Sequence, residues 1–295
     1  MNSLSISNLS KTYPNGVKAL QNITLNIPTG MFGLLGPNGA GKSTLMRTIA
    51  TLQEADTGSV KLGDLDALNQ KHELRKVLGY LPQQFGLYPK ISAEVLLNHL
   101  AVLKGITNRK ERLELVNVLL HKTNLYDVKK QNLSGFSGGM KQRFGIEQAL
   151  LNTPKLLIVD EPTAGLDPLE RNRFYNILSE LSENTVVILS THIVDDVKEL
   201  CTNMAIINKG QVLLKGNPLE LINQIEGNVY QKTIHKVELE DYKKEYKVIA
   251  ERLFLGKPII HILSEENPKN GFISVNAGLE DVYFSQILAS SSKNI

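Results

Sequence analysis

Tryptophan is absent from this 295-residue chain, aromatic residues make up only 6% of it, and cysteine occurs once. The single Cys201 has no second cysteine with which to form an internal disulfide, which predicts the reducing conditions of the cytosol. Long apolar runs are missing as well, because the longest uninterrupted runs, such as Leu156 to Val159, are only a few residues. A membrane-spanning helix needs roughly 20 apolar residues. Any role at a membrane is therefore expected to depend on a separate membrane partner.

A large excess of charge is missing too, since 33 Lys and Arg residues face 30 Asp and Glu residues, for a net charge of +3. Nucleic-acid binders usually cluster basic residues more densely, so no nucleic-acid partner is expected. The N-terminal residues MNSLSISNLSK have neither the basic nor the apolar region of a signal peptide, which predicts no export. With 42% apolar residues, the chain can bury the core of one or two domains.

Apolar residues alternate in the first thirty positions, at Leu4 and Ile6 and again from Ile23 to Ile27. The residues Pro14 to Gly16 supply a turn between the two segments, so the pattern predicts an antiparallel β layer. Met31 to Leu35 is apolar on both faces and leads directly into glycines, as a buried central strand does.

Two more buried strands are predicted at Leu156 to Val159 and at Val186 to Leu189, followed by a hairpin over Asn203 to Leu214. Helices are expected from Ser92 to about Lys122 and from Gly138 to Leu151. The order of elements predicts an α/β fold with a mostly parallel core sheet, the antiparallel β layer, an inserted helical subdomain and a small C-terminal appendage.

The main domain is expected over residues 1–225, with the helical insert at about 84–150. The composition changes near Gly227, and residues 236–247 are dense in Lys and Glu. The appendage is therefore assigned to residues 226–295, with short β-like runs at "PIIHILS" and "GFISV" and no predicted fold.

A phosphate loop follows the strand at Met31 to Leu35. Its residues are Gly36, Pro37, Asn38, Gly39, Ala40, Gly41, Lys42, Ser43 and Thr44. Glycines let backbone N–H groups close around phosphate oxygens, and the following helix adds its positive N-terminal end. Lys42 supplies a cation to the phosphates, and the Ser43 hydroxyl can bind Mg²⁺.

Two carboxylates, Asp160 and Glu161, end the strand at Leu156 to Val159. At the C-terminal edge of a parallel sheet they are expected beside the phosphate loop. Asp160 is assigned to Mg²⁺, and Glu161 to orienting and deprotonating the attacking water.

Three further residues are candidates for the same site. His192 ends the strand at Val186 to Leu189 and could contact the γ-phosphate, although a lone histidine is more often structural. Gln83, with Gln84 as its rival, lies in "GYLPQQF" and could reach Mg²⁺ or the attacking water at a mobile joint. Tyr13 could stack on a nucleotide base or be an ordinary half-buried aromatic.

A second stretch, "LSGFSGGMKQR" from Leu133 to Arg143, also has the small residues and helical start of a phosphate site. The phosphate loop, Gln83, "SGGMKQ", "VDE" and His192 occur in the order found in the ATP-binding cassette (ABC) ATPases, and over about residues 1–225 the chain resembles that family. The matching register is Phe136-Ser137-Gly138-Gly139-Met140, because Lys141-Gln142-Arg143 follows it. Phe136 stands where the family usually has Leu.

The resemblance implies a P-loop NTPase of the ABC type that binds and hydrolyses ATP with Mg²⁺. In that family, Ser137, Gly138 and Gly139 would close over the γ-phosphate bound by the other subunit. This implies a head-to-tail, ATP-dependent dimer with a second copy of the chain, or with a closely related subunit. Ala164 to Asp167 matches the D-loop, which crosses the dimer interface, although Asp167 could equally be only a helix cap. Pro168 and Glu170 would then complete the start of that helix, with Glu170 closing a capping box.

The resemblance also implies an integral membrane permease subunit as partner, and a location in the cytoplasm on the inner face of the cell membrane. The ending "GLEDVYFSQIL" resembles that of ATPases serving ABC-2-type exporters, which favours export. Leu279, Val282, Tyr283 and Ile287 fall at helical spacing there, which suits a docking or dimer helix, or core packing. The alternatives are a soluble ABC ATPase acting on ribosomes or DNA, and a GTPase suggested by "NKGQ" at Asn208 to Gln211. The GTPase motif lacks the acidic residue that reads guanine.

Overall fold

The computed structural model describes residues 3–163 and 166–292. An antiparallel sheet in the order β2-β1-β4-β5 forms the N-terminal layer. Its strands are β1 (Leu4–Thr12), β2 (Lys18–Ile27), β4 (Thr57–Leu62) and β5 (Leu65–Asp66). Leu4 pairs opposite Ile27, and along both strands buried apolar side chains alternate with more exposed polar ones. The antiparallel layer predicted from the period-two pattern is thus confirmed.

A six-stranded sheet in the order β10-β9-β3-β8-β7-β6 forms the centre of the molecule. The strands are β3 (Gly30–Leu35), β6 (Leu78–Leu81), β7 (Leu156–Asp160), β8 (Val186–Thr191), β9 (Asn203–Asn208) and β10 (Gln211–Gly216). Only β10 runs antiparallel to its neighbour. The mostly parallel sheet and the predicted hairpin, which is β9 with β10, are confirmed. A parallel sheet ends its strands at one edge, so the loops after β3, β7 and β8 meet there.

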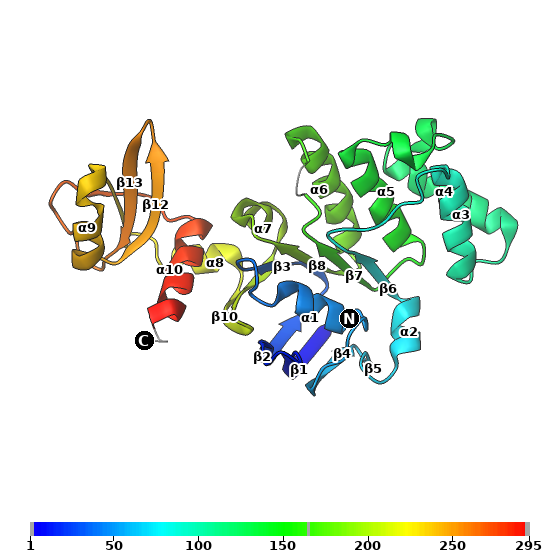
Figure 1. Ribbon diagram of the computed structural model, residues 1–295, viewed down its shortest axis with the longest axis horizontal. Helices are drawn as coiled ribbons and strands as arrows, with labels where there is room; N and C mark the ends of the chain where they lie inside the picture. The colour runs from blue at the N-terminus through cyan, green and yellow to red at the C-terminus, as the bar shows by residue number, and fades with distance from the viewer. Residues whose placement is uncertain (1–2, 164–165, 293–295) are drawn as a thin grey trace.

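Helices cover both faces of the central sheet (Figure 1). One face packs on α1 (Lys42–Ile49) and the antiparallel layer, and α2 (Lys71–Lys76) lies beside them. The other face packs on α6 (Pro168–Ser182), α7 (Val194–Leu200) and the helical insert. Along β3, Phe32 and Leu34 belong to the first core while Met31 and Leu35 belong to the second. This explains why the strand is apolar on both faces.

The helical insert contains α3 (Ala93–Leu103), α4 (Arg109–Lys122) and α5 (Gly138–Leu150), with short 3-10 turns between the last two. The region expected to be helical from Ser92 to Lys122 is therefore two helices. Asn108 begins α4 by accepting hydrogen bonds from the backbone of Lys110 and Glu111. No helix in the described ranges has the length and hydropathy of a membrane span.

The start of α6 departs from the predicted capping box. Asp167 caps the helix, since its Oδ1 accepts a hydrogen bond of 2.9 Å from the Glu170 N–H. The Glu170 carboxylate turns away from the cap to Arg143 and Arg173. Because an ion pair with α5 competes for this side chain, only half of the box forms.

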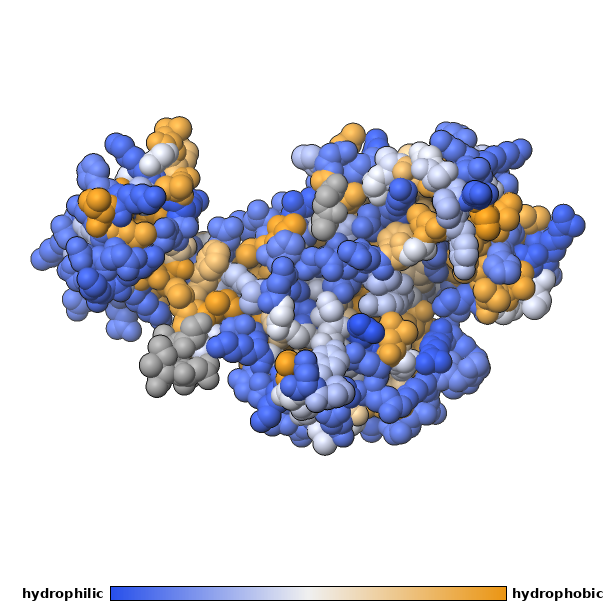
Figure 2. All heavy atoms as spheres, viewed as in Figure 1, coloured by the Kyte–Doolittle hydropathy of each residue, from blue (hydrophilic) through white to orange (hydrophobic). Residues whose placement is uncertain are grey.

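A separate antiparallel sheet follows α8 (Pro218–Asn223), in the order β12-β13-β11-β14. Its elements are β11 (Val229–Thr233), α9 (Leu239–Glu245), β12 (Val248–Phe254), β13 (Lys257–Leu263) and β14 (Ile273–Ser274). It has a small core of its own, formed by Tyr230, Ile234, Ile260, Ile262 and Phe272. The β12–β13 turn is apolar and exposed, with Leu255 89% accessible, and Figure 2 shows this tip in orange at the upper left.

The last helix, α10 (Leu279–Ser292), returns from this sheet to the main domain (Figure 1). Leu279, Val282 and Tyr283 are buried in the same core as α7 and α8. The helical spacing at this end of the chain therefore serves core packing. At the helix start, Asp281 lies 2.7 Å from Nδ1 of His261 on β13, which ties the helix to the appended sheet as well.

Replacement of Leu279 tests how much the main domain depends on α10. The Leu279 side chain is only 1% exposed. Leu279→Ala leaves a cavity in its place, so we expect the free energy of unfolding to fall by about 2–5 kcal/mol. The matched control is Leu253→Ala, at a position that is 72% exposed. There the loss should stay within about 0.5 kcal/mol. Urea unfolding measures both, and equal losses would contradict the packing role of α10.

Candidate nucleotide-binding site

The phosphate loop connects β3 to α1, and its path depends on glycine. Gly39 and Gly41 have φ of +78° and +105°, values that residues other than glycine rarely adopt. A Cβ at Gly36 would lie 2.2 Å from the Ile207 carbonyl oxygen, so no side chain fits there. The loop borders a cavity of about 690 Å³. Its lining includes every residue from Pro37 to Thr44, together with Tyr13, Gln83 and Glu161.

Lys42 is the first residue of α1, and only 5% of it is exposed. Its ammonium donates hydrogen bonds to the carbonyl oxygens of Gly36, at 2.6 Å, and Pro37, at 3.3 Å. Burial lowers the pKa of Lys42, while the nearby carboxylates of Glu161 and Asp160 act in the opposite direction. A phosphate entering the loop would therefore meet a cation that is already oriented and poorly solvated.

Asp160 is the last residue of β7 and is 4% exposed. Its Oδ1 atom is buried and has no hydrogen-bond partner in the described part of the chain. Burial raises the pKa of Asp160, and the hydroxyls of Ser190 and Ser43 lower it. A buried carboxylate oxygen without a partner, next to the Ser43 hydroxyl, suits a small cation such as Mg²⁺ that takes oxygen ligands.

Glu161 follows Asp160 in a left-handed backbone conformation, with φ of +46°. Its N–H donates to the Ser190 carbonyl oxygen at 2.9 Å, which ties the residue after β7 to the neighbouring strand β8. Non-glycine residues in this conformation are strained and occur often at functional sites. The strain here turns the Glu161 side chain toward the cavity, which it lines, while only 10% of it is exposed.

Three side chains from other elements converge on the Glu161 carboxylate. Gln83 donates from Nε2 to Oε2 at 3.0 Å, and His192 Nδ1 lies 3.2 Å from Oε1. The Lys42 ammonium lies 3.9 Å from Oε1. Gln84, the rival of Gln83, does not line the cavity. Segments that are far apart in the sequence thus meet at one carboxylate.

Tyr13 is half-buried at the edge of the cavity. Its hydroxyl lies 3.1 Å from Thr44 Oγ1 and donates to Gln53 Oε1 at 3.3 Å. These contacts fix the tyrosine ring against the start of α1. The ring therefore has both a structural anchor and a position beside the phosphate loop.

The signature stretch begins α5, away from the cavity. Ser137 caps the helix by accepting a hydrogen bond of 3.2 Å from the Met140 N–H. Ser137 and Gly138 are exposed, and none of the residues Ser137, Gly138 and Gly139 lines the cavity. Phe136 is 4% exposed and meets Phe144 edge to face, so this residue in place of leucine is accommodated in the core. Of the D-loop, Asp167 is described as the cap of α6, and Ala164 and Gly165 lie outside the described residues.

Comparison with known proteins agrees with this geometry. Residues 20–164 match the ABC transporter domain family. The chain is 33% identical over 288 residues to the uncharacterized ABC transporter ATP-binding protein YxlF of Bacillus subtilis, covering 97% of this chain and 90% of that protein. This chain belongs to the ABC transporter ATP-binding proteins.

Two further comparisons extend the match. The daunorubicin/doxorubicin resistance ATP-binding protein DrrA of Streptomyces peucetius is 33% identical, over 90% of this chain and 78% of DrrA. Among solved structures, a dimeric post-hydrolysis state of the ATP-binding cassette MJ0796, bound to ADP and Pi, aligns with a TM-score of 0.66 at 26% identity. It covers 72% of this chain and 98% of MJ0796. The predicted ABC-type P-loop fold and the resemblance to ABC ATP-binding proteins are confirmed.

Several residues that support the site in this ABC protein have no sequence signal for that role. The turn between β9 and β10 braces the phosphate loop, because the Gly210 N–H donates to the Ala40 carbonyl oxygen at 2.9 Å. Lys209, from the same turn, lines the cavity. Asp196 is fully buried on α7 and accepts hydrogen bonds from Thr163, at 2.8 Å, and Thr191, at 3.0 Å. These contacts join distant segments, so only the folded chain reveals them.

Replacement of Lys42 tests the phosphate loop. Lys42→Ala removes a charge-assisted contact of about 1.5–3 kcal/mol, so we expect the affinity for ATP to fall about 10- to 100-fold. Lys71→Ala removes an exposed lysine paired with Glu54 and should bind ATP as wild type does. A nucleotide titration measures both affinities, and wild-type binding by Lys42→Ala would show that the loop is misassigned.

Proposed function

We propose that this chain is an ATP-hydrolysing subunit that powers transport, in the export direction, through a separate integral membrane permease. The observation that carries the proposal is the convergence of Lys42, Gln83 and His192 on Glu161 at the phosphate-loop cavity. A carboxylate held in this way can act on a water molecule beside a bound phosphate. The name of DrrA, a drug resistance ATP-binding protein, supports transport and export rather than work on ribosomes or DNA.

In the proposed reaction, water attacks the γ-phosphorus of ATP and gives up a proton to Glu161. The bond between the γ-phosphorus and the bridging oxygen breaks, and ADP leaves with that oxygen. Gln83 orients the Glu161 carboxylate through its amide, and His192 occupies the other side of the carboxylate, where it can sense the γ-phosphate. Lys42 and the backbone of residues 36–44 hold the phosphates. The Tyr13 ring stacks on the adenine base of the nucleotide.

The metal proposed for the site is Mg²⁺, with Ser43, Asp160 and Gln83 as candidate ligands. The unpartnered Asp160 Oδ1 beside Ser43 fits this assignment best. Gln83 donates to Glu161 and would have to turn its amide oxygen toward the metal. Bound Mg²⁺ would supply charge neutralisation to the phosphate oxygens.

The proposed active state is a head-to-tail dimer of two copies of the chain. Ser137 and Gly138 are exposed at the start of α5, yet no signature residue reaches the cavity of its own chain. The N-terminal end of a helix is positive and attracts phosphate. A second chain would bring its phosphate loop to this end of α5, so each ATP would be held between two subunits. Asp167 is proposed to lie at the same interface in addition to capping α6.

The permease is proposed to dock beside the helical insert. A groove of about 440 Å³ runs between the insert and the central sheet, and its lining includes Leu52, Leu100 and Leu103. Leu52 and Leu103 are 55% and 70% exposed, and Figure 2 shows hydrophobic surface on the right-hand side of the molecule, over α3 and α4. Exposed apolar surface of this kind marks protein contacts. The chain would then lie in the cytoplasm, on the inner face of the membrane.

The proposed division of the chain keeps residues 1–225 as the ATPase domain and residues 226–295 as an appendage. The segment from Gln84 to Leu150 within the ATPase domain would pass the nucleotide state to the permease. Gln83 directly precedes this segment and contacts Glu161. Loss of the γ-phosphate would therefore change the contacts of Gln83, where the helical insert joins the central sheet.

A signature variant tests the trans arrangement. Ser137→Arg should still bind ATP at its own Lys42 site but should lose hydrolysis, because arginine blocks the surface that closes on the partner's phosphate. Mixed with Lys42→Ala chains, it should recover activity at one composite site, built from its own phosphate loop and the other chain's signature. Phosphate release by each chain alone and by the mixture measures this.

The register provides a matched control. Ser134→Arg places the same side chain on an exposed serine three residues earlier and should hydrolyse ATP as wild type does. Full activity of Ser137→Arg, together with inactivity of Ser134→Arg, would mean that the signature is assigned to the wrong serine.

A variant of the general base tests the chemical step. Glu161→Gln keeps the side-chain shape and the Lys42 site but lacks basicity toward water, so we expect hydrolysis to slow about 10²–10⁴-fold. The variant should accumulate as a dimer with ATP and return to monomer when ATP is removed, while wild type with ADP should be mostly monomeric. ATPase assays and size-exclusion runs with each nucleotide measure this.

Glu180→Gln makes the same change on an exposed part of α6 and should behave as wild type. Normal turnover by Glu161→Gln would rule out Glu161 as the base. If Glu161→Gln hydrolyses ATP slowly but elutes at the same size with and without ATP, the proposed ATP-dependent dimer is wrong.

A further inference from the structure

We infer that Glu170 and Arg143 are positioning residues that hold the signature turn at the start of α5 and the Asp167 end of α6 as one unit. The inference rests on the proposed trans role of Ser137. Neither residue lines the nucleotide cavity, so each would act on hydrolysis through the elements it holds.

Glu170 lies directly against the signature turn. A Cβ added at Gly139 would come within 2.8 Å of Glu170 Oε2 and 2.9 Å of its Cγ. Because Gly139 has no side chain, the Glu170 carboxylate can occupy this space. The Glu170 side chain is 15% exposed, so this contact is largely closed to water.

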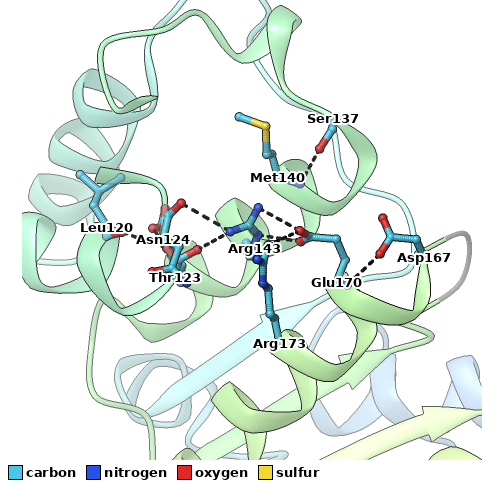
Figure 3. A network of polar contacts seen from close by, with 10 residues as sticks. Leu120, Thr123, Asn124, Ser137, Met140, Arg143, Asp167, Glu170 and Arg173 are labelled. Atoms are coloured by element: carbon cyan, nitrogen blue, oxygen red, sulfur yellow. Dashed lines mark hydrogen bonds and ion pairs between the residues drawn. The ribbon is translucent and has the colours of Figure 1, made fainter. Parts of the chain in front are cut away.

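Arg143 holds the carboxylate from the same helix that carries the signature (Figure 3). Its Nε lies 3.0 Å from Glu170 Oε2, and a second nitrogen donates to Oε1 at 3.5 Å. The remaining nitrogen donates to the Thr123 carbonyl oxygen at 2.8 Å, which fixes the arginine to the end of α4. The Nε contact is an ion pair without hydrogen-bond geometry. The planar guanidinium presents several nitrogens at fixed positions, so one side chain can contact Glu170 and the Thr123 carbonyl oxygen together, which a lysine cannot reproduce.

The other end of the unit is the cap of α6. The Glu170 N–H donates to Asp167 Oδ1 at 2.9 Å, while Ser137 caps α5 through Met140 at 3.2 Å. Figure 3 shows both caps and the ion pair between them. The first turns of two helices, which carry two of the proposed interface residues, are thus joined through one glutamate.

The joint matters because both Ser137 and Asp167 would face the partner subunit. If the first turn of α5 shifts relative to α6, the two residues cannot meet their partners together. A misplacement of about 1 Å can reduce a rate by about 10²-fold even when it arises far from the reacting atoms. The side chains of Arg143 and Glu170 are only 8% and 15% exposed. Dissolved salt weakens the attraction between two partly buried charges only slightly, so the ion pair can hold this geometry.

The first experiment compares three variants of the wild-type chain. Glu170→Ala should lower kcat by about 10²-fold at saturating ATP, while the affinity of the monomer for ATP at Lys42 should stay within about twofold. Glu170→Gln keeps the shape and should retain more activity. The control variant is Arg173→Ala, which removes the second partner of Glu170, 2.8 Å away and 45% exposed. Because exposed ion pairs contribute little, this control should hydrolyse ATP as wild type does.

The second experiment separates positioning from folding. In a mixture of Lys42→Ala and Ser137→Arg chains, the only competent signature belongs to the Lys42→Ala chain. Glu170→Ala added to that chain should abolish the activity of the mixture, whereas the same change in the Ser137→Arg chain should leave most of it. A folding defect would lower the yield of mixed dimers equally from either chain.

Three outcomes would overturn the inference. Wild-type kcat for Glu170→Ala would do so, and so would equal losses from both placements in an otherwise active mixture. The third outcome is an inactive mixture of Lys42→Ala and Ser137→Arg chains while wild type hydrolyses ATP. The trans role of Ser137 would then be wrong, and so would this inference, which rests on it. Thermal unfolding identifies a Glu170→Ala chain that does not fold, and Glu170→Gln and Arg143→Lys then supply the same comparison.

Discussion

The site depends on one largely buried carboxylate whose backbone is strained. Glu161 can be approached from three directions because its φ of +46° turns it out of the end of β7 and into the cavity. Lys42 reaches it from α1, Gln83 from the start of the insert and His192 from the end of β8. The surrounding sheet maintains the strain, because it fixes the Glu161 N–H on Ser190.

The presence of two glycine-containing helix starts in one domain has a geometric explanation. The first starts α1 and forms a cavity with its own chain, while the second starts α5 and leaves Ser137 and Gly138 exposed. The second start is complete as a helix cap but incomplete as a phosphate site. In the proposed dimer, its missing half would be the phosphate loop of another subunit.

The C-terminal helix connects the appendage to the elements behind the site. α10 packs on α7, and α7 begins two residues after His192. Asp196 on α7 also accepts a hydrogen bond from Thr191, the residue before His192. The contact between His261 and Asp281 joins the appended sheet to α10. The appendage thus shares a packed core with the segment that carries His192.

Much of the fold and most residues of the candidate site could be predicted from local pattern. Glycine spacing identified the loop around Lys42, apolar runs identified β3, β7 and β8, and motif order gave the family. These signals are local because a phosphate loop and a buried strand each use consecutive residues. Tertiary structure alone decided which side chains meet. The capping box predicted for Glu170 failed because Arg143, from another helix, competes for its carboxylate, and pairing between distant segments has no period in the sequence.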